Sequence, residues 1–240
     1  MRRSAARSDS KKHAAPLLGA FLLAAALVAY NNLRPGLVGL RYVGVNLLVG
    51  GILALTSIAF LKSDSLELGL RGNRPRVVAA AGSAAVILVA PLFLLAAFEP
   101  TASWIADDRV AGLGASDLAF HALIRIPVGT ALFEEFVFRG ALFGLLSRRG
   151  QLFGAVASSV PFGLWHIRPT LNVIDANAPD AGALSAGVAV SAAVLITTIA
   201  GLAFCWLRVT GRGIAAPVAL HAGLNSLALL AAALAHRQLP

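Results

Sequence analysis

Two adjacent acids and one base interrupt a long apolar stretch of this sequence. Glu134, Glu135 and Arg139 lie within residues 131–140, which contain no turn signal. An ionised side chain at bilayer depth costs at least about 2.5–3.5 kcal/mol, so such residues are usually paired or functional. Glu135 and Arg139 are one helical turn apart, acid before base, and are expected to form an ion pair. Because successive helical residues point about 100° apart, Glu134 faces elsewhere and is the candidate for chemistry.

Two other apolar segments carry polar residues that could join Glu134. His166 ends one segment, and His221 and Asn225 lie one helical turn apart in another. Glu134 and His166 could hold a water molecule and deprotonate it. His221 and Asn225 could then donate hydrogen bonds to the oxyanion that forms when this water attacks a carbonyl. Alternatively, Glu134, His166 and His221 could ligate Zn²⁺, with water in the fourth position. The sequence leaves both versions open.

Each of these residues also has a purely structural interpretation. The acids and the arginine could be a buried ion pair with one stray acid. A lone histidine within a membrane often bonds a neighbouring backbone, and Asn225 could join two helices at a gain of about 0.6 kcal/mol. The combination favours a site, because two carboxylates, two histidines and an amide fall on three expected helices with almost no other polar residue at depth.

The composition places these residues in a membrane protein. Of the 240 residues, 58% are hydrophobic and 13% are charged, whereas soluble domains contain roughly 45–50% and 25%. We therefore predict an all-α, polytopic transmembrane bundle of about seven to eight helices, with spans at residues 15–30, 36–61, 77–98, 118–146, 152–167, 183–207 and 214–235. The net charge of +9 does not indicate nucleic-acid binding, because the basic residues lie between the apolar segments. The single cysteine, Cys205, excludes an internal disulfide and is expected to be a buried thiol.

The charge distribution predicts the topology and the domains. Residues 1–14 form an expected disordered basic tail in the cytoplasm, followed by one transmembrane domain at residues 15–240 with an uncleaved first helix. The basic loops fall on the side of this tail and the acidic loops on the other, which predicts a plasma membrane protein with its N-terminus inside.

Three local expectations are a short interfacial helix around Trp104, a polar loop at residues 168–182, and a helix packed closely on Gly140 and Gly144.

The three polar motifs together resemble those of a known family. Glu134-Glu135-x-x-x-Arg139, Phe162-x-x-x-His166 and His221-x-x-x-Asn225 are similar to the signature of the CAAX prenyl protease and bacteriocin-processing (CPBP, or Abi) family of intramembrane endopeptidases. The resemblance covers residues 118–235, which we expect to be a catalytic core of four helices.

The resemblance implies a role for each of the matching residues. Glu134, helped by His166, would activate the water, and Glu135 with Arg139 would support it. His221 and Asn225 would stabilise the oxyanion. Family members are described both as metalloproteases and as enzymes whose glutamate works without metal, and we prefer the metal-free version here.

The sequence thus predicts an intramembrane endopeptidase, bacterial by its resemblance, with a peptide or membrane-protein substrate and the lipid bilayer as its surroundings. Two alternatives remain. One is a catalytically silent bacteriocin-immunity or scaffold protein of the same fold. The other is a proton-coupled or cation-coupled transporter, which is disfavoured because the deep acids are confined to one expected helix instead of following a path across several.

Overall fold

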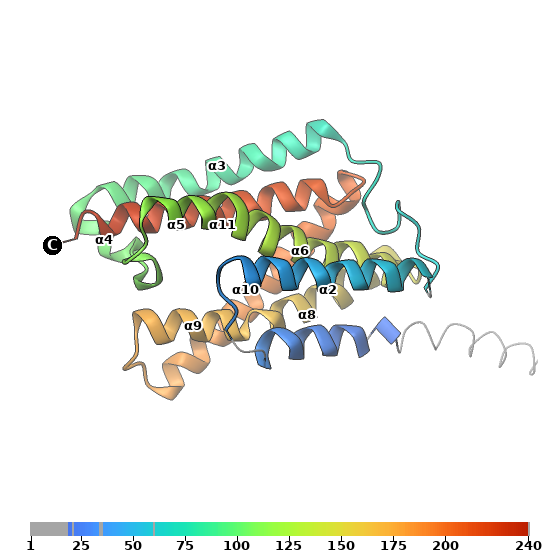
Figure 1. Ribbon diagram of the computed structural model, residues 1–240, viewed down its shortest axis with the longest axis horizontal. Helices are drawn as coiled ribbons and strands as arrows, with labels where there is room; N and C mark the ends of the chain where they lie inside the picture. The colour runs from blue at the N-terminus through green and yellow to red at the C-terminus, as the bar shows by residue number, and fades with distance from the viewer. Residues whose placement is uncertain (1–18, 21, 34–35, 60, 240) are drawn as a thin grey trace, which may run out of the picture.

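The computed structural model describes residues 19–20, 22–33, 36–59 and 61–239, and the expected tail at residues 1–14 lies outside these ranges. Within them the chain is all-helical, as predicted, with no strand (Figure 1). The helical elements in chain order are Leu22–Leu33, α2 (Gly39–Ala59), α3 (Pro75–Ala97), α4 (Glu99–Ile105), η1 (Asp108–Val110), α5 (Ala115–Phe120), η2 (His121–Leu132), α6 (Phe133–Glu135), η3 (Phe136–Leu142), α7 (Phe143–Ser147), α8 (Gln151–Trp165), α9 (Ile167–Asn177), α10 (Ala183–Thr210) and α11 (Ala215–His236).

Four of the described helices, α2, α3, α10 and α11, are long and apolar enough to cross a membrane by length and composition. Their bounds lie close to four of the predicted spans. The predicted span at residues 118–146 is a run of shorter helical elements from α5 to α7, and the short span at residues 152–167 is α8. Pro75 begins α3, where its missing N–H is no loss because the first helical N–H groups have no partner within the helix.

Two loop predictions have different outcomes. The short helix expected around Trp104 is confirmed as α4, and Trp104 is exposed. The prediction of a polar loop at residues 168–182 is wrong, because residues 167–177 form α9. Polar content alone does not distinguish a loop from an amphipathic helix. Arg168, Asn172 and Asp175 are exposed on one side of α9 while the apolar residues between them are partly covered, which is the pattern of an amphipathic helix.

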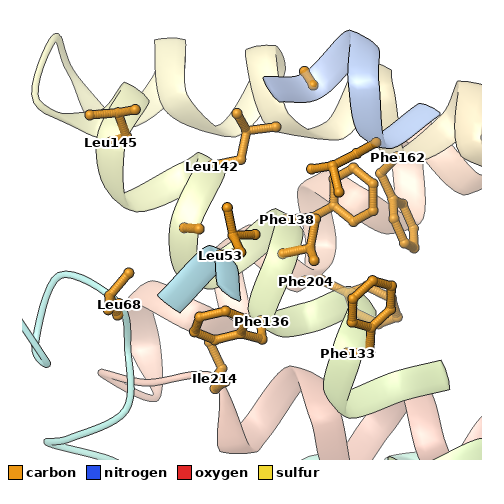
Figure 2. Packing of buried hydrophobic residues seen from close by; sticks show 14 of the residues in the cluster. Leu53, Leu68, Phe133, Phe136, Phe138, Leu142, Leu145, Phe162, Phe204 and Ile214 are labelled. Carbon is orange, nitrogen blue, oxygen red and sulfur yellow. The ribbon is translucent and has the colours of Figure 1, made fainter. Parts of the chain in front are cut away.

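The run from α6 to α7 lies at the centre of the bundle. Every residue from position 133 to position 146 is buried. Around this run, α3 packs along α11, α8 packs on α10 and α7, and η2 contacts both α2 and α11 (Figure 1). Figure 2 shows apolar side chains from these elements, among them Phe133, Phe136, Leu142 and Phe204, gathered into one core. The acids identified in the sequence are therefore held in the most enclosed part of the molecule.

A loop, not a helix, covers the glycine face of this central run. A Cβ atom added at Gly140 would lie 2.9 Å from the carbonyl oxygen of Leu68, and one at Gly144 would lie 2.6 Å from that of Glu67. The expectation that a helix packs on this face is thus wrong. Small residues allow any backbone segment to approach closely, and here the loop between α2 and α3 does so. The Arg208 guanidinium holds this loop by donating to the carbonyl of Glu67 at 3.0 Å.

The loops predicted to lie inside the cell meet at one end of the bundle, and the acidic segments meet at the other. At the first end, Arg148 pairs with Glu67, and Arg74 N–H donates to the Gly211 carbonyl. At the second end, Asp107 accepts hydrogen bonds from Arg109 and Asn177. Burial alone would raise the pKa of Asp107, but these hydrogen bonds outweigh it and lower the pKa to about 2.

We expect Gly144→Ala to destabilise the protein, because its Cβ would meet the Glu67 carbonyl and force the loop away from the central run. Overpacking of this kind costs about 1–3 kcal/mol of the free energy of unfolding, which a thermal or denaturant titration in detergent would measure. The matched control is Gly82→Ala in α3, where nothing lies within 4 Å of the added Cβ. Equal stability of the two variants would contradict this description of the packing.

Candidate active site

The two acids occupy a short α-helical segment between two π-helical stretches. Glu134 and Glu135 belong to α6, with π-helical turns before them in η2 and after them in η3. Pro127 lies inside η2, where its missing N–H removes a helical hydrogen bond. Turns of this wider kind are rare and are found frequently at functional sites. They change the direction in which the following side chains point, which periodicity in the sequence cannot reveal.

Glu135 is bound from two sides. Its Oε1 atom accepts a hydrogen bond from Arg139 Nη1 at 3.3 Å, and both side chains are fully buried. The same oxygen lies 2.9 Å from Nδ1 of His221 on α11. Since a carboxylate only accepts, His221 donates from Nδ1. The predicted ion pair is confirmed, and the structure adds His221 as a third member.

Aromatic rings surround the Arg139 guanidinium. Its Cζ atom lies 3.9 Å from the ring centroid of Phe162, 5.1 Å from that of Phe204 and 5.9 Å from that of Phe138. These three rings lie together in Figure 2. A desolvated cation over aromatic faces gains about 2 kcal/mol. The Phe204 ring also stacks on His221, with 5.3 Å between centroids. The rings therefore stabilise the buried cation and orient the imidazole.

Glu134 is held by a residue that the sequence analysis did not select. Trp165 Nε1 donates to Glu134 Oε1 at 2.9 Å, and both side chains are buried. The second carboxylate oxygen, Oε2, lies 4.0 Å from His221 Nε2 and accepts no hydrogen bond from the described residues. A tryptophan directly before His166 was a usable signal, because a buried indole N–H needs an acceptor.

His166 lies at the end of α8, beside this cluster. Its Nδ1 atom is 2.7 Å from the carbonyl oxygen of Phe162, and the two rings are 4.6 Å apart between centroids. Because a carbonyl only accepts, Nδ1 carries the proton and Nε2 is left as an acceptor. The Phe162 ring also contacts the His221 ring, at 6.2 Å between centroids. His166 thus reaches the cluster through Phe162, and its predicted action on a water with Glu134 stays a prediction.

The structure does not bring Asn225 into the buried cluster. It lies one helical turn beyond His221 on α11 and is exposed, whereas His221 is buried. Its predicted contact with an oxyanion stays a prediction.

The predicted zinc ligands do not form a metal-binding group. In the part of the chain that the structure describes, no three His, Cys, Asp or Glu side chains are placed so that they could hold a metal ion. His221 Nε2 and Glu134 Oε2 do face each other, but one nitrogen and one oxygen are fewer protein ligands than a catalytic zinc site has. We therefore derive no step through a metal.

This arrangement can perform acid–base chemistry on one bound group. Glu134 presents a single carboxylate oxygen without a hydrogen bond from the described residues, and its other oxygen is fixed by an indole. His221 is oriented by Glu135 so that Nε2 points toward that oxygen. A buried base with one oriented oxygen beside an oriented imidazole is a common geometry for moving a proton to and from a reacting group.

In a comparison with protein families, the chain matches the family described as type II CAAX prenyl endopeptidase Rce1-like over residues 115–227. The matched segment contains all three motifs, from Glu134 to Asn225. No curated protein and no solved structure matches the chain.

The Glu135–Arg139 pair gives a test of the site's electrostatics. Arg139→Met leaves Glu135 buried without its cation, and loss of one partner of a buried pair costs about 3–5 kcal/mol of stability. We expect the double variant Glu135→Gln, Arg139→Met to be clearly more stable than Arg139→Met alone, as measured by denaturant titration in detergent. The exposed Arg71→Met is the control. If the double variant is less stable than either single variant, the pairing energy assigned here is wrong.

Proposed function

We propose that the chain, which matches the Rce1-like family of type II CAAX prenyl endopeptidases over residues 115–227, cleaves peptide bonds within the membrane with a water molecule activated by Glu134. The observation that carries this mechanism is the state of the Glu134 carboxylate. It is buried, with Oε1 bound by Trp165, and its Oε2 accepts no hydrogen bond from the described residues. A fixed carboxylate with one available oxygen is suited to a general base.

The reaction then follows ordinary peptide hydrolysis. Glu134 takes a proton from the water while the water oxygen forms a bond to the carbonyl carbon of the substrate. When the carbon–nitrogen bond breaks, the protonated Glu134 gives this proton to the leaving amine. Trp165 keeps the carboxylate in one orientation through both steps, because its indole N–H binds Oε1. One residue thus acts first as base and then as acid.

His221 is the group that we assign to the oxyanion. Glu135 binds His221 Nδ1 and so turns Nε2 toward Glu134 Oε2, which lies 4.0 Å away. In the proposal, His221 donates its hydrogen bond to the oxyanion from this Nε2 edge of the ring. A donor fixed in advance at the place where negative charge develops is among the largest catalytic effects in enzymes. Glu135 and Arg139 therefore act through His221 without touching the substrate.

His166 and Asn225 complete the proposal at the edge of the cluster. With Nδ1 bonded to the Phe162 carbonyl, His166 offers Nε2 to accept a hydrogen bond from the water. Asn225 lies one turn beyond His221 on α11, and its exposed amide can donate to the substrate carbonyl. We assign both of these roles to the state in which a substrate is bound.

The substrate class and location follow from the family and the helices. A protease of this family takes a peptide or protein substrate, and we propose a membrane-associated one, because the site lies in the interior of the helical bundle. The basic loops at one end and the acidic segments at the other support a plasma membrane orientation with the basic end in the cytoplasm.

The mechanism predicts that Glu134→Gln abolishes cleavage. Glutamine preserves the size of the side chain and can still accept from Trp165, but it cannot take a proton from water. We expect a loss of at least about 10³-fold in kcat, somewhat beyond the lower range of general-base effects because the same residue also acts as acid. The assay is cleavage of a farnesylated peptide ending in a CAAX sequence by protein reconstituted in liposomes. Glu99→Gln, an exposed acid at the start of α4, is the control. Cleavage by Glu134→Gln at the wild-type rate would rule out this mechanism.

A second test addresses the metal. Because the described residues place no three ligands together, we expect cleavage of the same peptide to continue after dialysis against a chelator. Metal analysis of the purified protein before and after dialysis is the accompanying measurement. Loss of activity in chelator that Zn²⁺ restores would contradict the metal-free version and leave the role of Glu134 to be reassigned.

A further inference from the structure

The helix that carries Trp165 and His166 is broken directly after them. Helix α8 ends at Trp165, α9 begins at Ile167, and His166 between them has φ −84° and ψ 1°. In an unbroken helix the Trp165 carbonyl would accept from the N–H of residue 169, but Pro169 has none. The carbonyl behind the two site residues has therefore lost its helical donor. An unsatisfied backbone carbonyl away from water costs several kcal/mol, so a partner from elsewhere is needed.

Two asparagines from the first described helix supply the missing bonds. Asn31 Nδ2 donates to the Trp165 carbonyl at 2.7 Å. Asn32 Nδ2 donates to the Leu164 carbonyl at 3.1 Å, and its Oδ1 accepts from the N–H of Arg168 at 2.8 Å. Asn32 thus stands between a carbonyl and the N–H four residues later, which would bond each other in a continuous helix. A side chain inserted in this way is a recognised cause of helix kinks.

This contact connects a distant part of the chain to the proposed base. Asn31 and Asn32 lie more than 130 positions before the residues that they bind and outside the segment 115–227 that matches the family. Asn31 is buried, with 5% of its surface exposed. The Trp165 backbone is held by Asn31, and the Trp165 side chain holds Glu134 at 2.9 Å. Trp165 is therefore the single residue that links Asn31 to the Glu134 carboxylate through these two hydrogen bonds.

We propose that Asn31 and Asn32 are positioning residues for the reaction: together they fix the break between α8 and α9, and so set the Trp165 indole against Glu134 and place His166 beside it. Neither asparagine touches the reacting atoms. This inference rests on the proposed function for its catalytic consequence. Its structural part, control of the Trp165 side chain by the asparagines, can be measured without any substrate.

The experiment uses Trp165 as its own reporter. The chain contains three tryptophans, and Trp104 and Trp206 are exposed, so Trp104→Phe with Trp206→Phe leaves Trp165 as the sole source of indole emission. In this background Asn31→Leu removes the amide without adding charge or much volume. Asn172→Leu, the same change at an exposed asparagine of α9, is the control. Each protein is reconstituted in liposomes for emission, acrylamide quenching, thermal unfolding, and cleavage of the farnesylated CAAX peptide.

We expect Asn31→Leu to shift the Trp165 emission and increase its quenching, since the indole is no longer held against Glu134. We also expect kcat to fall by roughly tenfold to a hundredfold, as small displacements of catalytic groups do, with KM within about twofold of the parent. Asn172→Leu should leave all of these unchanged. If Asn31→Leu does not fold, the half-buried Asn32→Leu replaces it, with the same expectation.

Two results would overturn the inference. One is an Asn31 or Asn32 variant with the emission and kcat of the Asn172→Leu control. The other is a fall in stability and kcat with unchanged Trp165 emission and quenching, because the asparagines would then stabilise the bundle without positioning the indole. Failure of the proposed function looks different: the parent protein would not cleave the peptide, or Glu134→Gln would cleave it normally, whatever the emission spectra show.

Discussion

The main constraint on this structure is that charged groups inside a helical bundle have no water to solvate them. Glu135, Arg139 and His221 meet this constraint by bonding one another, and aromatic rings cover the guanidinium. A buried charge that loses its partner destabilises a protein strongly, so these residues must be placed together or not at all. The surrounding fold can be understood as the means of holding this group, because the elements that supply it are the same ones that form the core.

The same constraint applies to the backbone. The central run departs from regular α-helix on both sides of the two acids, and α8 breaks directly after Trp165. The break after Trp165 removes backbone hydrogen bonds that a membrane protein must replace from within. At the end of α8 the replacement comes from asparagine side chains. Irregular backbone at these places turns polar side chains toward one another, which a set of straight helices with the same sequence would not do.

Sequence patterns predicted much of this arrangement and missed specific parts of it. Apolar length located the spans well, because hydrophobic runs separated by charged loops depend only on composition. The spacing of Glu135 and Arg139 predicted their ion pair for the same reason: both lie on one helix. The polar content of residues 168–182 did not indicate α9, and no motif predicted the contacts of Trp165, Asn31 and Asn32. Their contacts lie between elements that are far apart along the chain, where no local spacing indicates them.

By itself the sequence determined that the chain is a helical membrane protein, that two acids and a base lie deep within one of its helices, and that the acid and base one turn apart would pair. These conclusions follow from local chemistry and helical periodicity. Only the tertiary structure decided which group each remaining polar atom meets: His221 on Glu135, Trp165 on Glu134, the asparagines at the end of α8, and a loop on Gly144. The physical reason is that partners across a helical bundle depend on how helices rotate, bend and break, and those rotations are set by packing of the whole chain.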